Sequence, residues 1–390
     1  MNATKPRDTE MNGTIDPARR PAALIFRKRL LPWSETFIAA QGRALVRYRP
    51  VFVGYRDIQA GKSYLAGEDR VLLEEHALLP FLARGAFKAF GRVPRRWLRA
   101  LESRSPTLIH AHFGNNAAAA LPLARALGIP LLATFHGMDI AIERKGAQRQ
   151  QLERVFREAA RVIAVSEFIA GRLRTAGCPG EKITVHHIGV DTGRFAPGDP
   201  GARAAARILF VGRLVPKKGL IHLLRAMASV QRAVPEATLV IAGDGPLRPE
   251  LERAAAEHGA HCEFLGVQSP DRVRELMRTA TVLAAPSVVA ADGNAEGLPI
   301  TIMEAQASGL PVVAFPSGGS AEGFIDGETG LLAPAGDEAA LAAHLTGLLG
   351  DAARRARFSA AARAFALQQF DLARQTAKLE EIYDEVAGRR

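Results

Sequence analysis

Residues 292–304 read Asp-Gly-Asn-Ala-Glu-Gly-Leu-Pro-Ile-Thr-Ile-Met-Glu, and the chain continues to residue 314 as Ala-Gln-Ala-Ser-Gly-Leu-Pro-Val-Val-Ala. Gly297 and Pro299 predict a loop that opens into a helix, because glycine permits close backbone approach and proline suits a first helical turn. The apolar run at 311–314 predicts a buried strand directly after that helix. This stretch therefore indicates the helix-to-strand unit of a parallel α/β sheet.

Two carboxylates bracket the predicted helix start. Glu296 precedes the helix, and Glu304 lies five or six residues inside it, roughly 8–9 Å further along the axis. The free N–H groups of Leu298, Ile300 and Thr301 would form an anion site between them. A phosphate on the helix end with a carboxylate on each side fits a nucleotide sugar. The alternative is a capping carboxylate followed by an ordinary surface glutamate.

Apolar runs alternate with amphipathic stretches twice along the chain, which predicts two parallel α/β sheets. The segment Ala196-Pro-Gly-Asp-Pro-Gly201 is typical of a linker between them. The strands are predicted at 22–26, 50–54, 107–111, 130–135, 161–165 and 183–187, and at 207–211, 238–242, 262–265, 281–285, 311–314 and 330–332.

The composition narrows the class of protein. With 390 residues, 48% of them hydrophobic, the chain can bury two cores. Cys178 and Cys262 show no paired spacing, which indicates a reducing compartment and argues against a metal cluster. Residues 1–20 are polar with no apolar core segment, so we expect them to be disordered and to be neither a signal peptide nor an anchor. No apolar run reaches the roughly 20 residues of a membrane helix, and we expect a cytoplasmic protein.

The net charge of +11 is unevenly placed. Residues 1–200 carry a net charge of +13 and residues 201–390 a net charge of −2, so the first half should approach something anionic. Within it, 84–104 mixes cations with large apolar residues and fits a helix on an anionic membrane. The alternative is a helix pair that packs on the core, and nucleic acid fits the domain pattern poorly. The cations are Arg84, Lys88, Arg92, Arg95, Arg96, Arg99 and Arg104.

The carboxyl ends of parallel strands are where ligands bind in open α/β sheets, and polar residues follow several predicted strands. Arg213 and Lys218 follow strand 207–211 and suit a diphosphate, although solvated cations at a helix entry would also explain them. His110 and His112 point the same way on a strand, so we weighed a metal site against a role in the core and favour the core. Ser166 fits either a site position or a helix N-cap.

A family resemblance emerges from these residues. Glu-x7-Glu with an internal Gly-x-Pro, followed by Glu-Ala-x-Ala-x-Gly-x-Pro-Val-Val-Ala, resembles the signature of retaining GT-B glycosyltransferases of the family 4 type, related to sucrose-phosphate synthases and bacterial mannosyltransferases. The block Ser34-Glu-Thr-Phe is similar to the branch that assembles exopolysaccharides such as colanic acid. The resemblance implies two doubly wound Rossmann-like domains facing a central cleft: an acceptor-side domain at 21–197, a nucleotide-sugar domain at 202–370, and a helix at 371–390 that crosses back to the first.

The resemblance also implies roles for individual residues. Arg213 and Lys218 would neutralise the leaving diphosphate, and His136 would reach the donor sugar at the reaction centre, with Glu296 holding the sugar hydroxyls. The implied donor-binding residues are Arg213, Lys218, Gly266, Val267, Glu296, Gly297, Leu298, Pro299, Ile300 and Glu304. The first loop departs from the family, since Arg27-Lys28-Arg29 stands where many relatives have Gly-Gly. We therefore expect no backbone contact from this loop to phosphate.

The predicted reaction is retaining transfer of a hexose from a nucleotide diphosphate sugar to a lipid-linked oligosaccharide, in exopolysaccharide or lipopolysaccharide biosynthesis. No Asp-x-Asp element is present, so we expect no metal and no cofactor. We expect a cytoplasmic enzyme at the cytoplasmic face of the inner membrane, with an anionic membrane surface as a partner and no nucleic acid. The alternatives are a non-hydrolysing nucleotide-sugar epimerase and a catalytically silent nucleotide-sugar-binding module.

Overall fold

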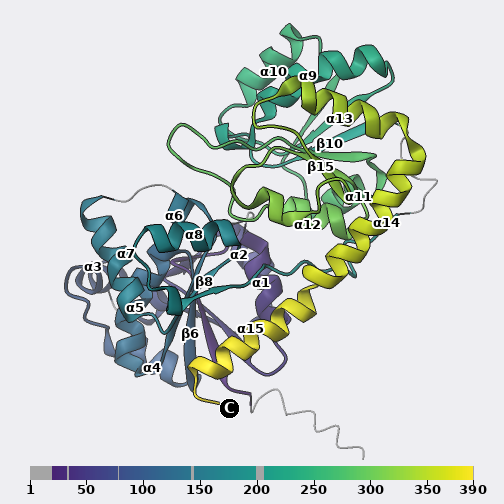
Figure 1. The fold of residues 1–390 in the computed structure, drawn as a ribbon. Coiled ribbons are helices and arrows are strands. Elements are labelled where there is room, and N and C mark those ends of the chain that lie inside the picture. Colours follow the sequence, from purple (N-terminus) through teal and green to yellow (C-terminus); the bar gives the residue numbers. More distant parts are fainter. Residues whose placement is uncertain (1–19, 33–34, 78, 142–144, 199–205, 390) are drawn as a thin grey trace, which may run out of the picture.

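The computed structural model describes residues 20–389 apart from 33–34, 78, 142–144 and 199–205, and within them the chain forms two α/β units (Figure 1). The expected disordered tail lies outside the described residues except for Arg20, as do Ser34 and the end of the expected linker. In the part of the chain that the structure describes, no helix is long and apolar enough to cross a membrane.

The N-terminal unit is built on a parallel sheet in the order β5-β3-β1-β6-β7-β8-β9. Its strands are β1 (Ala22–Phe26), β3 (Arg49–Gly54), β5 (Arg70–Leu72), β6 (Pro106–His112), β7 (Leu131–Phe135), β8 (Arg161–Ala164) and β9 (Ile183–Val185). The short β2 (Arg29–Leu30) and β4 (Arg56–Asp57) pair with each other after β1 and β3. The three residues of β5 were not predicted, because so short a run carries no clear period.

The C-terminal unit has a parallel sheet in the order β12-β11-β10-β13-β14-β15. This is the doubly wound order 3-2-1-4-5-6, in which the chain changes direction between the first and fourth strands. Its strands are β10 (Arg207–Val211), β11 (Thr238–Ala242), β12 (Cys262–Gly266), β13 (Val282–Ala285), β14 (Val312–Ala314) and β15 (Gly330–Leu332). The strands that the apolar runs predicted are confirmed to within two residues at each end.

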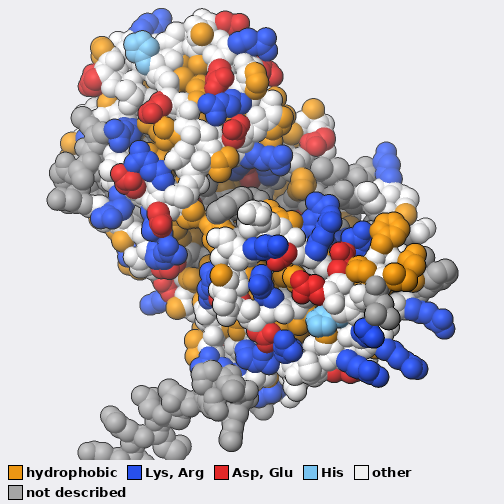
Figure 2. Space-filling model, turned by 180° about the vertical axis from the view of Figure 1, so that it is seen from behind, with side chains coloured by type: hydrophobic (Ala, Val, Ile, Leu, Met, Phe, Trp, Pro, Cys, Tyr) orange, Lys and Arg blue, Asp and Glu red, His pale blue; other side chains and the backbone are white. Residues whose placement is uncertain are grey.

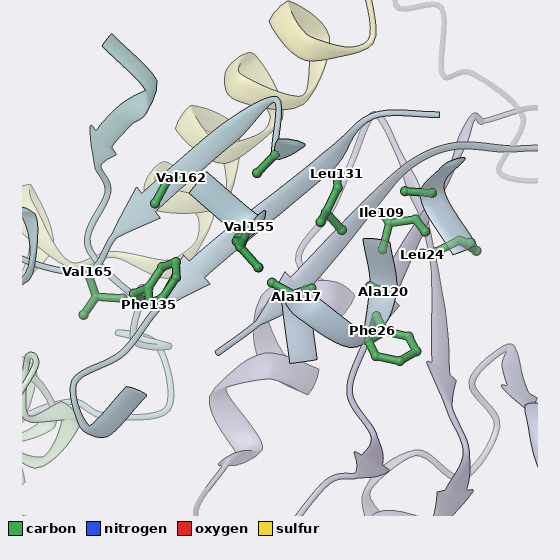
Figure 3. Packing of buried hydrophobic residues seen from close by; sticks show 14 of the residues in the cluster. Leu24, Phe26, Ile109, Ala117, Ala120, Leu131, Phe135, Val155, Val162 and Val165 are labelled. Atoms are coloured by element: carbon green, nitrogen blue, oxygen red, sulfur yellow. The ribbon is translucent and has the colours of Figure 1, made fainter. Parts of the chain in front are cut away.

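Helices cover both faces of each sheet. On the N-terminal sheet, one face packs against α3 (Pro80–Phe90), α4 (Arg95–Glu102), α5 (Gly114–Leu127), α7 (Gly146–Glu158) and α8 (Glu167–Thr175), and Figure 3 shows part of this core. The other face packs against α1 (Thr36–Arg43) and the last helix of the chain. The short α2 (Gln59–Tyr64) and α6 (Met138–Ala141) lie in connections. On the C-terminal sheet, α9 (Leu220–Ala233), α10 (Arg248–Glu257) and α13 (Glu338–Gly350) cover one face, and α11 (Pro270–Thr279) and α12 (Ile300–Ala307) the other.

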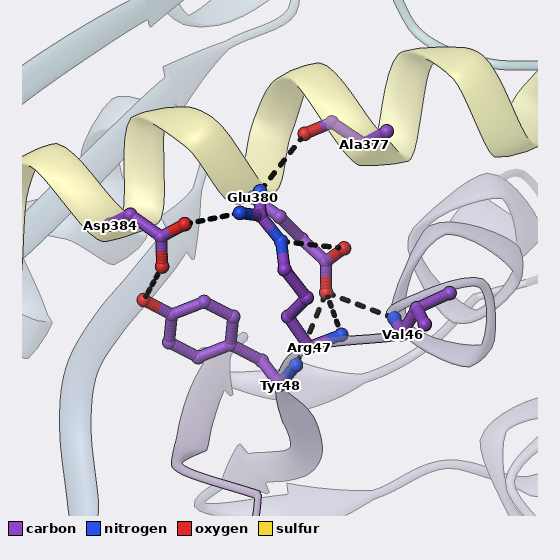
Figure 4. Close-up of polar contacts among 6 residues, drawn as sticks. All are labelled: Val46, Arg47, Tyr48, Ala377, Glu380 and Asp384. Carbon is purple, nitrogen blue, oxygen red and sulfur yellow. Dashed lines mark hydrogen bonds and ion pairs between the residues drawn. The ribbon is translucent and has the colours of Figure 1, made fainter. Parts of the chain in front are cut away.

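The end of the chain ties the two units together. After α14 (Ala352–Gln369), α15 (Leu372–Val386) runs from the C-terminal unit onto the N-terminal unit (Figure 1). Figure 4 shows its anchor: one oxygen of Glu380 accepts the backbone N–H groups of residues 46, 47 and 48 at 2.9, 2.7 and 3.1 Å. The hydroxyl of Tyr48 also donates to Asp384 at 2.8 Å. Although α15 follows the C-terminal unit in sequence, it thus completes the core of the N-terminal unit.

Candidate active site

The Glu296–Glu304 segment lies where the units meet. Pro299 is the N-cap residue of α12 rather than part of its first turn, since the helix begins at Ile300. The backbone here is packed so closely that a side chain at 297 would overlap the carbonyl oxygen of His136, which explains the glycine. The loop at 318–319 wraps the same segment just as closely. The helix start is therefore pressed against the end of β7 from the other unit.

Glu296 is a buried carboxylate held by cations. Its side chain is 5% exposed, with Nζ of Lys218 at 2.8 Å from Oε1 and Nζ of Lys217 at 3.3 Å from Oε2. The hydroxyl of Ser287 donates to it at 3.2 Å. Burial alone would raise the pKa of Glu296, but the two ammonium groups outweigh it and lower this pKa to about 2. The site therefore keeps one negative and two positive charges together at neutral pH.

The turn after β10 delivers these cations. Pro216–Lys218 forms a single 3₁₀ turn, and Gly219 follows with a φ of 62°, where a side chain would overlap the carbonyl oxygen of Pro286. Only Lys218 was named from the sequence, and the structure brings Lys217 to Glu296 as well. Arg213 is exposed and makes no ion pair with the described residues.

Glu304 contrasts with Glu296. It is the fifth residue of α12, and no described side chain bonds to its carboxyl group. Burial raises the pKa of Glu304 to about 8, so the group is mostly protonated at neutral pH. The structure therefore gives Glu304 a different protonation state from Glu296, although the sequence motif pairs the two residues. At the end of β12, Gly266 is buried with a φ of 70° and accepts the N–H of Gly243 at 2.8 Å, whereas Val267 is 70% exposed.

His136 enters from the N-terminal unit, directly after β7. Its Nε2 lies 3.1 Å from Nδ1 of His112, and its ring packs 4.5 Å from that of Phe113 and 5.1 Å from that of Phe37. Asp139 accepts the backbone N–H groups of His136 and Gly137 at 3.1 and 2.9 Å, which fixes this turn. Burial, with nearby His110 and Arg27, lowers the pKa of His136 to about 3. The imidazole is thus neutral at physiological pH.

His110 belongs to the core. It bonds to the hydroxyls of Tyr383 and Thr134 at 2.7 and 2.6 Å, and its side chain is 1% exposed. Among the residues that the structure describes, no group of three His, Cys, Asp or Glu side chains could hold a metal ion. Ser166 is the N-cap of α8, as one of the two alternatives predicted, since it accepts the N–H of Ile169 and also donates to the carbonyl of Gly297 at 2.7 Å.

Several site residues escaped the sequence reasoning. Arg27 and Glu35 form an ion pair, with Arg27 Nε 2.6 Å from the carboxylate, and the guanidinium lies 4.6 Å over the ring of Phe113. Glu322 reaches from the C-terminal unit to accept the N–H groups of Glu167 and Phe168 at 2.7 and 2.9 Å. Arg27 and Glu35 lie eight residues apart across a loop, and Glu322 lies 155 and 154 residues from its partners, so neither contact follows a helix or strand repeat.

Segment 84–104 divides between the two alternatives considered for it. Phe87, Trp97 and Leu101 are buried in the core, so much of its apolar side packs internally. Just before and within α3, however, Leu79, Phe81 and Leu82 are 62, 77 and 61% exposed. The face shown in Figure 2 has Lys and Arg side chains beside exposed hydrophobic ones at the edge of this unit. The exposed cations of α4 and the turn before it are Arg92, Arg95, Arg96 and Arg99.

Comparison with known proteins places this geometry in a family. Residues 34–194 match the model of Glycosyltransferase Family 4, and residues 202–365 match that of Glycosyl transferases group 1. The two matches divide the chain at the boundary between the two units.

Two relatives and one solved structure show the extent of the likeness. A GDP-mannose-dependent alpha-(1-6)-phosphatidylinositol monomannoside mannosyltransferase of Mycolicibacterium smegmatis is 34% identical over 74% of this chain and 80% of its own length. The amylovoran biosynthesis glycosyltransferase AmsK of Erwinia amylovora is 30% identical over 72% of this chain and 70% of its own. The crystal structure of Anabaena Alr3699/HepE in complex with UDP covers 94% of this chain and 100% of its own, with a TM-score of 0.77 and 21% identity. This last likeness confirms the two-domain GT-B fold.

Proposed function

We propose a specific reaction for this chain, which belongs to the glycosyltransferases that join a Family 4 domain to a group 1 domain. The proposed reaction transfers a hexose, with retention of configuration, from a nucleotide diphosphate sugar to a lipid-linked oligosaccharide. The product would be an exopolysaccharide or lipopolysaccharide precursor. Support for the acceptor class comes from relatives whose names refer to phosphatidylinositol mannoside and to amylovoran.

The observation that carries the proposal is the Lys217–Lys218–Glu296 cluster beside the contact between His136 and Gly297. Departure of a diphosphate builds negative charge, and fixed cations at that point stabilise the transition state without rearrangement. Arg213 and the start of α12 would add to this field. Glu296 would accept the sugar hydroxyls, and Glu304 the ribose hydroxyls. His136, neutral at physiological pH, would act as a hydrogen-bond partner and not as a charge.

The donor is to be identified by a binding screen. UDP-sugars and GDP-sugars both belong in it, since one relative is named as GDP-mannose-dependent and one neighbour was solved with UDP. Thermal shift with each donor selects the nucleotide. Incubation of that donor with an oligosaccharide acceptor, followed by NMR of the product's anomeric proton, tests transfer and retention. An inverted anomeric centre would contradict the retaining reaction.

The same assay separates the alternatives. Epimerised donor in the absence of acceptor would favour an epimerase, and donor that is bound but unchanged with every acceptor would favour a silent binding module. We also propose that the reaction needs no metal ion, because lysine and arginine side chains stand where the diphosphate would bind. Activity should survive EDTA, and loss of activity that magnesium or manganese restores would contradict this.

We further propose that the N-terminal unit rests on the cytoplasmic face of the inner membrane through Leu79, Phe81, Leu82 and the exposed arginines of 92–99. Each cation near an anionic bilayer contributes about 1 kcal/mol, which salt screens. Binding to vesicles that contain anionic lipid should therefore weaken as salt rises. Changing Arg92, Arg95, Arg96 and Arg99 to Ser should release the protein and leave donor binding intact. A wild-type protein that ignores such vesicles at low salt would indicate a soluble acceptor.

A further inference from the structure

Two adjoining cavities open into the N-terminal unit beside the reaction centre, and both are lined by Asn115 and Gln151. The first, which we call the Phe113 cavity, measures about 260 Å³, and the second, the Tyr55 cavity, about 570 Å³. Because they share two lining residues, the cavities form one groove that leads from the Phe113 side to the Tyr55 side. The proposed mechanism assigns the donor to the C-terminal unit and leaves this groove without a ligand.

The Phe113 cavity begins at the reaction centre. Phe113 lines it and lies against the His136 ring, and Asp139, which fixes the His136 turn, lines it as well. Phe113 has a φ of 71°, a backbone conformation that residues other than glycine rarely adopt. Such strained residues are concentrated at functional sites. The exposed amides of Asn115 and Gln151 supply neutral donors and acceptors of the kind that sugar hydroxyls need.

The Tyr55 cavity has a different character. Tyr55 is 4% exposed, yet its hydroxyl makes no hydrogen bond to the described residues. The hydroxyl oxygen is not fully buried although the residue is, so it is open to a hydrogen bond from a molecule in the cavity that Tyr55 lines. The Tyr55 ring is held by the rings of Phe26, Phe87 and Trp97 at 6.0, 6.2 and 5.9 Å, which gives the hydroxyl a fixed position.

The charged residues that line the Tyr55 cavity are all basic: Lys28, Arg125 and Arg154. Arg125 is paired with Glu158, which satisfies one of these cations. Arg154, on α7, is exposed and forms no ion pair with the described residues. A cavity with cations, one unpartnered phenol and no acidic residue among the described ones that line it favours an anion, since charge-assisted hydrogen bonds are stronger than neutral ones.

We propose that the groove is the acceptor site, with a neutral sugar ring in the Phe113 cavity and an anionic group of the acceptor in the Tyr55 cavity. That anion would be a phosphate ester or a sugar carboxylate. Arg154 and the hydroxyl of Tyr55 are the residues that recognise it. The inference deepens the proposed function and rests on it for the identity of the reaction.

The test uses the full-length protein with its nucleotide site filled by saturating nucleoside diphosphate, so that phosphate probes report on the groove alone. The probes are glucose 1-phosphate, glucuronic acid and methyl glucoside, titrated by NMR. We expect at least one anionic probe to bind about tenfold more tightly than the neutral one, as expected for one charge-assisted contact. The stronger of the two anionic probes identifies the anion as phosphate or carboxylate.

The variants are Arg154→Gln and Tyr55→Phe, each expected to remove most of that preference while binding of methyl glucoside stays unchanged. Arg149→Gln is the matched control, because Arg149 lies on the same helix, pairs with Glu153 and lines neither cavity. Equal affinity for charged and neutral probes, or equal binding by all variants, would overturn the proposal and leave the Tyr55 hydroxyl as a solvated group.

Slow hydrolysis of the donor in water, without acceptor, distinguishes a failure of the acceptor-site proposal from a failure of the proposed function. Variants that hydrolyse donor like the wild type but show no change in probe binding overturn the acceptor site alone. A wild-type protein that neither binds nor hydrolyses any nucleotide sugar overturns the proposed function instead. Thermal unfolding of each variant confirms that it is folded, and Tyr55→Phe should leave stability nearly unchanged because it removes an unpartnered group.

Discussion

The N-terminal unit keeps its buried imidazoles neutral, whereas the C-terminal unit buries a charged carboxylate. Burial lowers the pKa of His110 and His136 to about 3, and neither has an acidic partner among the described residues. Glu296 is buried as deeply, yet Lys218 and Lys217 keep it ionised. The difference shows that burial decides the protonation state unless an opposite charge lies within bonding distance. At the active site, the imidazole of His136 is therefore neutral and the carboxylate of Glu296 is charged.

The largest expected effect is that acid weakens the two units unequally. Below pH 6.5 the unfolded chain protonates its histidines, while folded His110, His136 and His186, with pKa values of about 3, 3 and 4, stay neutral. The N-terminal unit should thus lose roughly 4–6 kcal/mol between pH 7 and 5. Glu304, with its pKa of about 8, works in the opposite direction, since the folded carboxyl keeps its proton and stabilises the C-terminal unit as pH falls.

Hydrogen exchange at pH 7 and 5, corrected for intrinsic rates, measures this difference strand by strand. Protection should fall in β1 and β6 more than in β10 and β13. His186→Gln should reduce the acid sensitivity, because it removes a titrating group and keeps an N–H that can donate to Gln375 O. Equal loss of protection in both units would contradict the predicted difference in acid sensitivity between them.

Removing one cation from the Lys217–Lys218–Glu296 cluster should slow the transfer reaction. In Lys218→Ala, transfer should slow by about 10–100-fold, since a charge-assisted contact is worth about 1.5–3 kcal/mol. Lys217→Ala should have a smaller effect, because its ammonium group lies 3.3 Å from Glu296 rather than 2.8 Å. Glu296→Gln should reduce turnover far more than nucleotide affinity. Steady-state kinetics measures turnover, and nucleotide titration measures affinity. Turnover at the wild-type rate in Lys218→Ala would refute the role of Lys218 in transfer.

Nucleotide binding should depend on the protonation of Glu304. If ribose hydroxyls donate to its carboxylate, binding must release the proton that the free protein holds below pH 8. Affinity should then rise about fiftyfold between pH 6 and 8, because a free carboxyl with a pKa of about 8 is almost fully protonated at pH 6 and half protonated at pH 8. Calorimetry in buffers of different ionisation enthalpy measures the proton release. The Glu304→Gln variant should bind nucleotide more weakly and with an affinity that does not change with pH. A wild-type nucleotide affinity that is independent of pH would argue against the contact between Glu304 and the ribose.

The smallest effect concerns the bond between the units. Ser166 and Ser269 both cap a helix, each 3.2 Å from the N–H three residues on, but only Ser166 also bonds to Gly297. Each Ser→Ala change should cost about 1 kcal/mol for the cap. Only Ser166→Ala should speed hydrogen exchange at 297–301 and slow transfer. If Ser269→Ala did the same, the contact between units would have no separate role.

Local patterns were sufficient to predict the two parallel sheets, the place of each long strand and the helix that starts beside Glu296. Hydrophobic periodicity and the Gly-x-Pro sequence act over a few residues, so they can be read in the chain itself. Lys218 and Glu296 were predicted as site residues for the same reason, since they lie after a strand end and before a helix start, whereas the role of His136 was implied by the family resemblance. The short β5 and the 3₁₀ turn that brings Lys217 to Glu296 left no such pattern.

Only the tertiary structure decided which of these groups carry charge and what they touch. The raised pKa of Glu304 and the lowered pKa of Glu296 arise from burial and from lysines about eighty residues away in sequence. The cavities between Phe113 and Tyr55, and the anchor of α15 on residues 46–48, join segments that share no local signal. Burial and electrostatic pairing depend on distances in space, which the order of residues along the chain does not contain.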